Sequence, residues 1–127
     1  MMIDVDKFKS VNDRFGHQTG DIVLERVSGL IKKYLRPEDL AGRYGGEEII
    51  VAIQSEFATA IEIAERIRAA VAEYKMRSPD HKEFNVTLSI GIASSGAFDF
   101  DAQRLIGRAD AAMYQAKNEG RDRVRMA

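Results

Sequence analysis

Two short acidic stretches carry the residue types that could do chemistry in this chain. The first is Tyr44-Gly45-Gly46-Glu47-Glu48, in which a glycine pair precedes two adjacent carboxylates and the apolar run 49–53. The second is Asp4-Val5-Asp6, which ends an apolar run. Adjacent carboxylates repel one another, and a divalent cation bound to a polyphosphate would offset that repulsion, since Mg²⁺ prefers one or two carboxylates together with phosphate oxygens. Each stretch also has an ordinary interpretation, because solvated hairpin tips and strand ends often carry such residues.

The surrounding elements must bring the two stretches together if they form one site. Residues 1–6 predict a strand, and residues 7–15 predict a short helix with apolar side chains at 8, 11 and 15. Residues 40–44 and 47–53 predict a hairpin about the glycine pair. If that hairpin lies beside the first strand, Asp4 and Glu47 converge. The start of the short helix would also offer free backbone N–H groups at Lys7 and Phe8 to phosphate oxygens.

The rest of the sequence predicts helices and strands that can share one core. Gly16 ends the short helix, and Thr19 or Asp21 can cap the next one, whose apolar face reaches Leu35 and which Pro37 stops. The later elements are predicted as helix 58–75, polar turn 78–82, strand 84–93 with one buried face, loop 94–100, a helix from the Asp101 cap to Gly120, and a strand near 123–125. Because hairpins and crossover helices alternate, we expect an α+β fold with a central, mostly antiparallel sheet flanked by helices in two or three layers.

Composition excludes several classes of function. A chain of 127 residues with 45% hydrophobic content predicts a single domain with its own core. Nineteen Lys and Arg against 20 Asp and Glu give a net charge of -1, which provides no overall basic field for a nucleic acid polymer or an anionic membrane. The absence of cysteine excludes disulfides and thiol chemistry, leaves hard-cation sites, and fits a reducing cytoplasm. No apolar run is long enough to span a membrane in this segment, and we expect a cytoplasmic domain.

Five motifs follow one another along the chain. They are Asp4–His17, Gly20-Asp21, Arg43–Glu48, Val86–Ala93 and Ala109–Val124. In residue types, order and spacing they resemble the signature of the GGDEF family of diguanylate cyclases, and they cover nearly the whole chain. That family condenses two GTP molecules into cyclic di-GMP and pyrophosphate, on a fold similar to nucleotide cyclases and to the palm of polymerases. The resemblance therefore implies a nucleotidyltransferase with a palm-like fold.

The resemblance also assigns residues to metal binding and catalysis. Asp4 and Glu47, with the carbonyl of Val5, would ligate Mg²⁺ or Mn²⁺. Glu48 would either ligate a second metal or deprotonate the attacking 3′-hydroxyl, and the sequence leaves both roles open. Lys9 would lie near the reacting phosphate.

A further set of residues corresponds to the family's GTP site. It comprises Lys7, Phe8, Asn12, Asp21, Gly45, Gly46, Lys117 and Arg121. Asn12 and Asp21 match the guanine readers and predict a preference for GTP over ATP, because Asp21 can accept from guanine N1–H and the 2-amino group. Lys117 and Arg121 match the residues that hold the β and γ phosphates. Outside this framework each would be an ordinary polar residue at a helix end.

Arg36-Pro37-Glu38-Asp39 matches the family's R-x-x-D inhibitory site in its distance from the glycine pair. Arg36 can fork onto guanine O6 and N7 or a phosphate, and Asp39 can read the guanine edge. Arg66 is placed like the second arm of that site. The resemblance thus implies product inhibition by cyclic di-GMP, whereas an exposed Arg and Asp at a turn is the plain alternative.

Two departures from the family pattern affect these expectations. The helix and turn that precede the first strand in the family are absent, so we expect residues 1–127 to be a single catalytic domain lacking its first helix, excised from a longer multidomain signalling protein. Its sensory domain would lie elsewhere, and a membrane anchor of the full-length protein stays open. The fifth motif position is Ile49 rather than phenylalanine, a change that alters packing more than chemistry.

The resemblance implies that activity needs a homodimer in which each domain presents one GTP. Two rival functions stay open at this point. One is a catalytically weak module that binds GTP or cyclic di-GMP, and the complete Gly-Gly-Glu-Glu sequence favours the enzyme over it. The other is a different nucleotidyl cyclase or polymerase-like palm, which Asn12 and Asp21 disfavour because they fit guanine.

Overall fold

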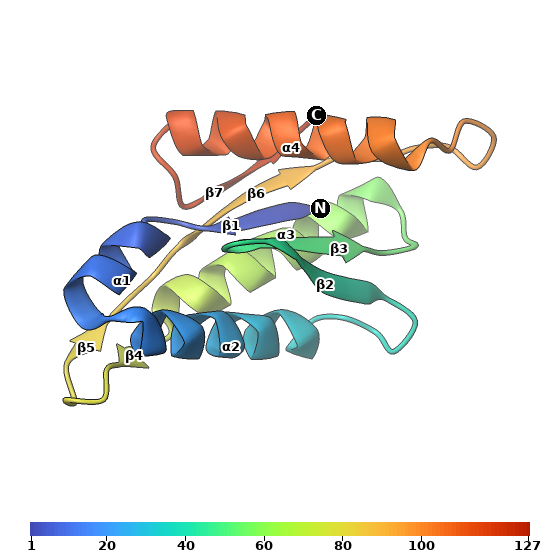
Figure 1. Cartoon of the computed structure of the whole chain (residues 1–127). Helices are drawn as coiled ribbons and strands as arrows, with labels where there is room; N and C mark the ends of the chain where they lie inside the picture. Colours follow the sequence, from blue (N-terminus) through green and yellow to red (C-terminus); the bar gives the residue numbers. More distant parts are fainter.

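Four helices and seven strands follow one another in the computed structural model, which describes all 127 residues (Figure 1). In chain order they are β1 (Met2–Val5), α1 (Phe8–Phe15), α2 (His17–Lys33), β2 (Leu40–Gly45), β3 (Glu48–Ala52), α3 (Phe57–Glu73), β4 (Met76–Arg77), β5 (Glu83–Phe84), β6 (Leu88–Ile92), α4 (Ala102–Asn118) and β7 (Arg123–Met126). No helix is both long and apolar enough to cross a bilayer.

The main sheet has five strands in the order β2-β3-β1-β6-β7. β1 pairs antiparallel with both β3 and β6, β2 pairs antiparallel with β3, and only β6 and β7 run parallel. The expected α+β fold with a mostly antiparallel sheet is therefore confirmed. The order also places the hairpin β2–β3 directly beside β1, so the two acidic stretches lie at neighbouring strand ends.

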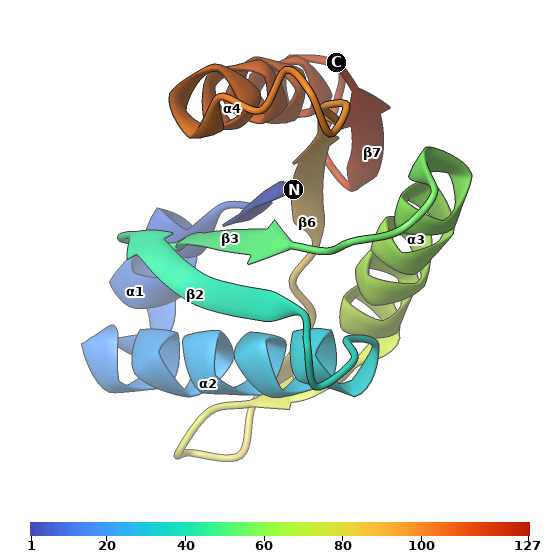
Figure 2. The same cartoon turned by 90° about the vertical axis from the view of Figure 1, so that its right-hand side faces the viewer.

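Helices cover the sheet from both sides (Figure 2). α2 and α3 pack on one face and contribute Val23, Val27, Ile31, Ala64, Ile67 and Val71 to the main core, together with Ile3 and Val5 of β1. α4 packs on the opposite face, where Ala109 and Met113 contact Met2. Side chains alternate along a strand, so Ile3 and Val5 face α2 and α3 whereas Met2 and Asp4 face α4. Asp4 is thereby aimed at the helix that carries Lys117.

The prediction of one buried face for strand 84–93 was wrong. β6 covers only Leu88–Ile92, and all five of its residues are buried. Its apolar face meets α3, and its polar face lies under α4, where Gly91 permits the contact. A Cβ on Gly91 would lie 2.0 Å from the backbone oxygen of Ala109. The polar residues of this strand, such as Ser89, therefore lie in the protein interior and need partners there.

The predicted cap of the second helix was also wrong. α2 begins at His17, directly after Gly16, so Thr19 and Asp21 both lie inside its first turns. Gly16 adopts φ 92° and ψ 162°, which breaks the helix for a single residue. Thr19 instead donates from Oγ1 to the Phe15 carbonyl at 3.1 Å, at the end of α1. The two helices consequently meet at a sharp junction that a sequence pattern of helical periodicity does not reveal.

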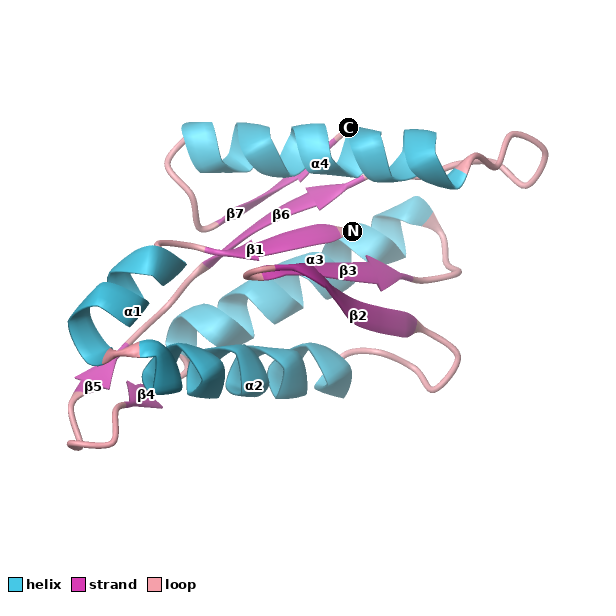
Figure 3. Cartoon of the chain, in the orientation of Figure 1, coloured by secondary structure: helices cyan, strands magenta, loops and turns pink.

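One helix end and one turn differ from the predictions (Figure 3). α2 ends at Lys33, before Pro37 is reached, because the chain tightens into bonds from Tyr34 N to Ile31 O and from Leu35 N to Lys32 O. The polar turn 78–82 is flanked by β4 and β5, a two-residue ladder that the sequence did not predict. The Asp101 cap is confirmed, since its Oδ1 accepts from the backbone N–H of Arg104 at 3.1 Å.

Candidate active site

The paired ends of β1 and β3 bring the predicted carboxylates together. Asp4 lies opposite Glu48 in the β1–β3 ladder, and the backbone N–H of Val5 points at the Glu47 carbonyl at 3.4 Å. Asp4 is only 3% exposed, whereas Glu47 and Glu48 are half-buried. The expected convergence of the two stretches is therefore confirmed by strand pairing.

Burial dominates the electrostatics of Asp4. Desolvation raises the pKa of its carboxyl above the ordinary value, the hydrogen bond and charge of Lys117 lower it, and the charges of Glu47 and Glu48 raise it further. A cation bound here would remove that penalty. The side chains alone do not form a finished metal site, since no group of three or more histidines or carboxylates is arranged around one point.

Lys117 is the basic partner of Asp4. Its Nζ donates to Asp4 Oδ2 at 2.9 Å, from the last turn of α4 to the end of β1. The Lys117 side chain is 29% exposed and that of Asp4 only 4%. Lys117, which the family resemblance assigns to phosphate binding, thus contacts a proposed metal ligand.

Open space adjoins the carboxylates at the hairpin tip. Gly46 has φ 52°, in the left-handed region that glycine adopts at little cost, and its carbonyl accepts from Arg43 Nε at 2.7 Å. A Cβ built on Gly45 or Gly46 would meet nothing within 4 Å. The two glycines therefore leave an unobstructed approach to Glu47 and Glu48.

The start of α1 follows β1 and lies next to the proposed carboxylate site. Lys7 occupies the helix N-cap in a left-handed conformation, φ 53°, and no side chain caps the first turn. Phe8 is half-buried, and Lys9 is exposed on the first turn. The backbone N–H groups of this turn are thus available to an anion, as predicted.

Asn12 has a side-chain oxygen without a partner. Its Oδ1 is buried and accepts no hydrogen bond, the only such side-chain atom in the chain. Buried polar atoms are seldom left unpaired in folded proteins, which makes this one a candidate for ligand contact. Asp21 is exposed on α2.

Gly20 leaves the space that the Asn12 side chain occupies, a role that the sequence reasoning missed. A Cβ at Gly20 would lie 1.9 Å from Asn12 Oδ1 and 3.1 Å from Phe8 Cζ. The close approach of α1 and α2 therefore requires glycine at this position. The signal in the sequence was its place next to Asp21, which indicated a motif but not this contact.

Asp6 is the second residue that sequence reasoning left without a role. It is 4% exposed, and its carboxylate accepts from Thr87 Oγ1 at 2.7 Å, Ser89 Oγ at 2.6 Å and the Asp122 backbone N–H at 3.1 Å. The alternation of Thr87 and Ser89 in an otherwise apolar stretch could have pointed to a buried acceptor on the neighbouring strand. Arg121, the other predicted phosphate ligand, lies in the same turn as Asp122 and is exposed.

The predicted inhibitory residues lie apart from this edge. The Arg36 backbone N–H donates to Asp39 Oδ2 at 2.7 Å, and the Asp39 N–H donates to the Arg36 carbonyl at 3.0 Å, which closes the turn before β2. The Arg36 side chain is exposed. Arg66 is exposed on α3, and no hydrogen bond or ion pair joins it to Arg36 or Asp39.

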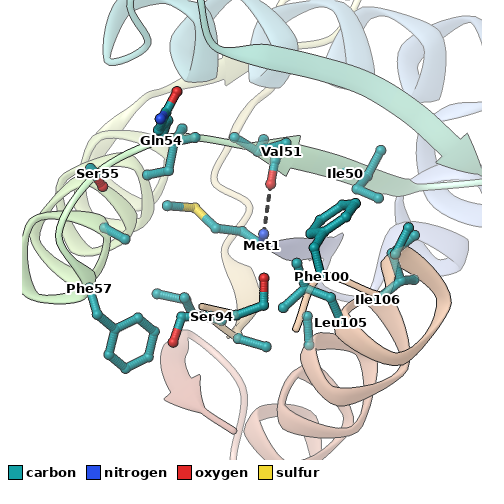
Figure 4. A pocket seen from close by; sticks show the side chains of 18 of the residues that line it. Met1, Ile50, Val51, Gln54, Ser55, Phe57, Ser94, Phe100, Leu105 and Ile106 are labelled. Carbon is teal, nitrogen blue, oxygen red and sulfur yellow. Dashed lines mark hydrogen bonds between the residues drawn. The ribbon is translucent and has the colours of Figure 1, made fainter. Parts of the chain in front are cut away.

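An apolar groove of about 680 Å³ lies elsewhere, between the start of α4, the end of β3 and the start of α3 (Figure 4). Met1 lies within it, and its backbone nitrogen donates to the Val51 carbonyl at 2.7 Å. The groove offers 16 hydrophobic residues among its 21 and does not suit a polyphosphate.

Comparison with known sequences identifies the family. The family model described as "Diguanylate cyclase, GGDEF domain" matches residues 1–123. Diguanylate cyclase A of Treponema denticola is 48% identical over 129 residues, which include 100% of this chain and 34% of that protein. Diguanylate cyclase DosC of Escherichia coli K12 is 42% identical over 99% of this chain and 27% of its own length. The chain thus spans about a third or less of these curated relatives.

Solved structures agree in fold. The GGDEF domain of PA1120 from Pseudomonas aeruginosa superimposes with a TM-score of 0.91 at 38% identity, over 99% of this chain and 79% of that one. The active GGEEF domain of a diguanylate cyclase from Vibrio cholerae gives 0.87 at 36% identity, over 98% and 81%. The GGDEF domain of DgcB from Caulobacter crescentus, solved with c-di-GMP, gives 0.91 at 33% identity, over 98% and 74%. On the family match, the relatives and the fold together, this chain belongs to the GGDEF domain family.

Proposed function

We propose that this domain is the catalytic part of a diguanylate cyclase, which condenses two GTP molecules into cyclic di-GMP with release of pyrophosphate. The observation that carries the proposal is the junction of β1, β3 and α4, where Asp4 lies opposite Glu48 and bonds to Lys117. Acidic groups for a cation and a basic group for phosphate meet there beside an open glycine turn. The names of the curated relatives support the same activity.

Guanine recognition is assigned to Asn12 and Asp21. The unpartnered Asn12 Oδ1 supports this assignment, because guanine presents N–H donors on the edge where adenine presents an acceptor at N1. Asp21 is an exposed carboxylate one residue from Gly20, which adjoins Asn12. The domain should therefore prefer GTP over ATP, and that preference would exclude an adenylyl cyclase.

The donor set fits a hard divalent cation, Mg²⁺ or Mn²⁺. Asp4, Glu47 and Glu48 would hold it with the Val5 carbonyl, and the bound cation would stabilise charge on the attacking and leaving oxygens. The protein groups do the remaining work. The N-terminus of α1, with its cap Lys7 and first residue Phe8, binds phosphate through backbone N–H groups, while Lys9, Lys117 and Arg121 neutralise phosphate charge.

The reaction requires two domains facing one another. In each half, the 3′-hydroxyl oxygen of one GTP forms a bond to the α-phosphorus of the other, and the bond to the pyrophosphate oxygen breaks. The hydroxyl proton passes to Glu48 or to solvent, depending on whether Glu48 acts as the base or as a second metal ligand. Because each domain holds only one GTP, an isolated monomer has no attacking group and should be inactive.

Product inhibition is assigned to Arg36, Asp39 and Arg66. The exposed guanidinium of Arg36 at a turn that Asp39 closes is suited to the edge and phosphates of a guanine nucleotide. The structure of DgcB with c-di-GMP supports the idea that a relative binds the product. Binding of cyclic di-GMP to the parent and to Arg36→Ala tests it, and an unchanged dissociation constant would refute the assignment.

Chromatography of nucleotides after incubation with GTP and Mg²⁺ separates the enzyme from a binding module. We expect cyclic di-GMP from GTP, none from ATP, and a rate per domain that rises with protein concentration because two domains must meet. Glu47→Ala should abolish synthesis, while Glu62→Ala, an exposed glutamate on α3, should not. Binding of GTP without turnover at any concentration would favour the rival binding module.

A further inference from the structure

Asp6 is a buried carboxylate that the proposed mechanism does not use. Its Oδ1 accepts from Ser89 Oγ, and its Oδ2 accepts from Thr87 Oγ1 and the Asp122 backbone N–H. No lysine, arginine or histidine forms an ion pair with it. Both oxygens are thus committed to neutral donors inside the protein, which distinguishes Asp6 from Asp4, whose single hydrogen bond comes from Lys117.

The turn that Asp6 contacts has an unusual backbone. Gly120, Arg121 and Asp122 adopt consecutive positive φ angles of 116°, 64° and 45°. Residues other than glycine rarely adopt this region, so such a conformation persists only where surrounding contacts impose it. The contacts here are bonds from Gly120 N to Lys117 O, from Arg121 N to Ala116 O and from Asp122 N to Asp6.

A second contact to this turn comes from helix α3. Arg68 on α3 donates to Asp122 Oδ1 at 2.7 Å and to Glu65 Oε2 at 2.8 Å. Figure 1 shows the turn from α4 to β7 returning close to the end of β1, where Asp6 follows the strand. The bond from the Asp122 N–H to Asp6 is partly buried and joins the turn to the residue that follows β1, while the Arg68 bond is exposed.

We propose that Asp6 is a positioning residue that holds the turn 120–122, and with it Arg121, beside Lys117 at the phosphate end of the site. The two carboxylates of Asp4-Val5-Asp6 then have different roles. Asp4 contacts Lys117 at the end of α4, and Asp6 contacts the turn that carries Arg121. This inference rests on the proposed function, which assigns both cations to the β and γ phosphates of GTP.

The test compares affinity for a GTP analogue with a nonhydrolysable α–β bridge against affinity for GMP, by calorimetry with Mg²⁺ present. GMP carries the guanine and the α-phosphate only, so the ratio of the two affinities isolates the β and γ phosphates. In Asp6→Asn, an amide nitrogen replaces one acceptor oxygen, and we expect the ratio to fall roughly tenfold with GMP affinity unchanged, as for loss of one charge-assisted contact. Thr87→Val should lower the ratio of the two affinities less than Asp6→Asn does.

Asp110→Asn is the matched control, because it makes the same chemical change at an exposed position of α4, and it should keep the parent's ratio. If circular dichroism shows that Asp6→Asn does not fold, Thr87→Val decides. A parental ratio in the deciding variants, or an equal loss of affinity for both nucleotides, would overturn the inference and leave the proposed function standing. A parent that binds the GTP analogue no better than GMP would overturn the phosphate assignment, and this inference with it.

Discussion

The ion pair between Lys117 and Asp4 can be tested by replacing the lysine with a methionine of similar length. In the parent, the Lys117 ammonium offsets a carboxylate that is 3% exposed and lies beside Glu47 and Glu48. Lys117→Met leaves that charge without its partner. We expect the variant to fold but to be less stable when no divalent cation is present.

The burial of the two partners sets the size of the effect. Removal of one member of a fully buried pair costs about 3–5 kcal/mol. Lys117 retains 29% side-chain exposure, so water screens part of the interaction and the expected loss is about 2 kcal/mol. With a urea m-value of about 2 kcal/mol/M, the unfolding midpoint should fall by about 1 M.

Mg²⁺ should then recover the stability that the lysine supplied. A cation that binds the folded state stabilises it by mass action. In the parent it must compete with Lys117 for Asp4, so the gain on adding Mg²⁺ should be larger in Lys117→Met. Lys33→Met, which removes an exposed lysine from the last turn of α2, is the matched control and should shift neither quantity.

A double-mutant cycle with Asp4→Asn completes the test. Because a neutral amide needs no compensating charge, the loss from Lys117→Met should nearly vanish in the Asp4→Asn background, giving a coupling of about 2 kcal/mol. Additive effects of the two substitutions would show that Lys117 and Asp4 are not coupled. So would a Mg²⁺ gain that is equal in parent and variant.

Three other changes give further expectations. Gly20→Ala places a Cβ 1.9 Å from Asn12 Oδ1 and should weaken GTP binding, measured by calorimetry, at least tenfold. Gly29→Ala on the same helix meets nothing within 4 Å and should raise the free energy of unfolding by about 0.5–1 kcal/mol. Gly91→Ala drives a methyl group into the backbone of α4 and should lower unfolding stability by about 1–3 kcal/mol in urea, which an unchanged midpoint would contradict. Asp4→Asn should abolish synthesis and flatten the pH dependence of stability. Burial raises the pKa of Asp4 in the folded state above 3.8, so the parent loses stability as the pH rises from 3.8 to the folded pKa, and the variant should not. A steeper loss of stability in the variant over that pH range would contradict this.

Local sequence chemistry determined most of the fold. Apolar periodicity located the helices 58–75 and 101–120 nearly as observed, since a helix that buries one stripe must repeat it every three or four residues. Asp101 was identified as a cap because its side-chain oxygen satisfies a backbone donor in the same segment. The glycine pair likewise predicted the hairpin.

Boundaries that depend on contacts between distant segments were predicted less well. The predictions of where α2 begins and of an exposed polar face on β6 were both wrong. The junction at Gly16 and the helix lying over Ser89 arise from packing between segments, which no local sequence pattern shows. The β4–β5 ladder escaped notice for the same reason, because two residues are too few to show a period.

The sequence was enough to predict which residue types the site contains, and that Asp4 lies near the end of a strand and Glu47 at the tip of a hairpin. How they meet depends on contacts between segments that lie far apart in the sequence. The antiparallel register sets Asp4 opposite Glu48, and the return of α4 across the sheet brings Lys117, more than a hundred residues away, to within 2.9 Å of Asp4. The tertiary structure also gave Asp6 its partners, because a buried carboxylate must find donors wherever the fold supplies them, and here they come from β6 and the last turn.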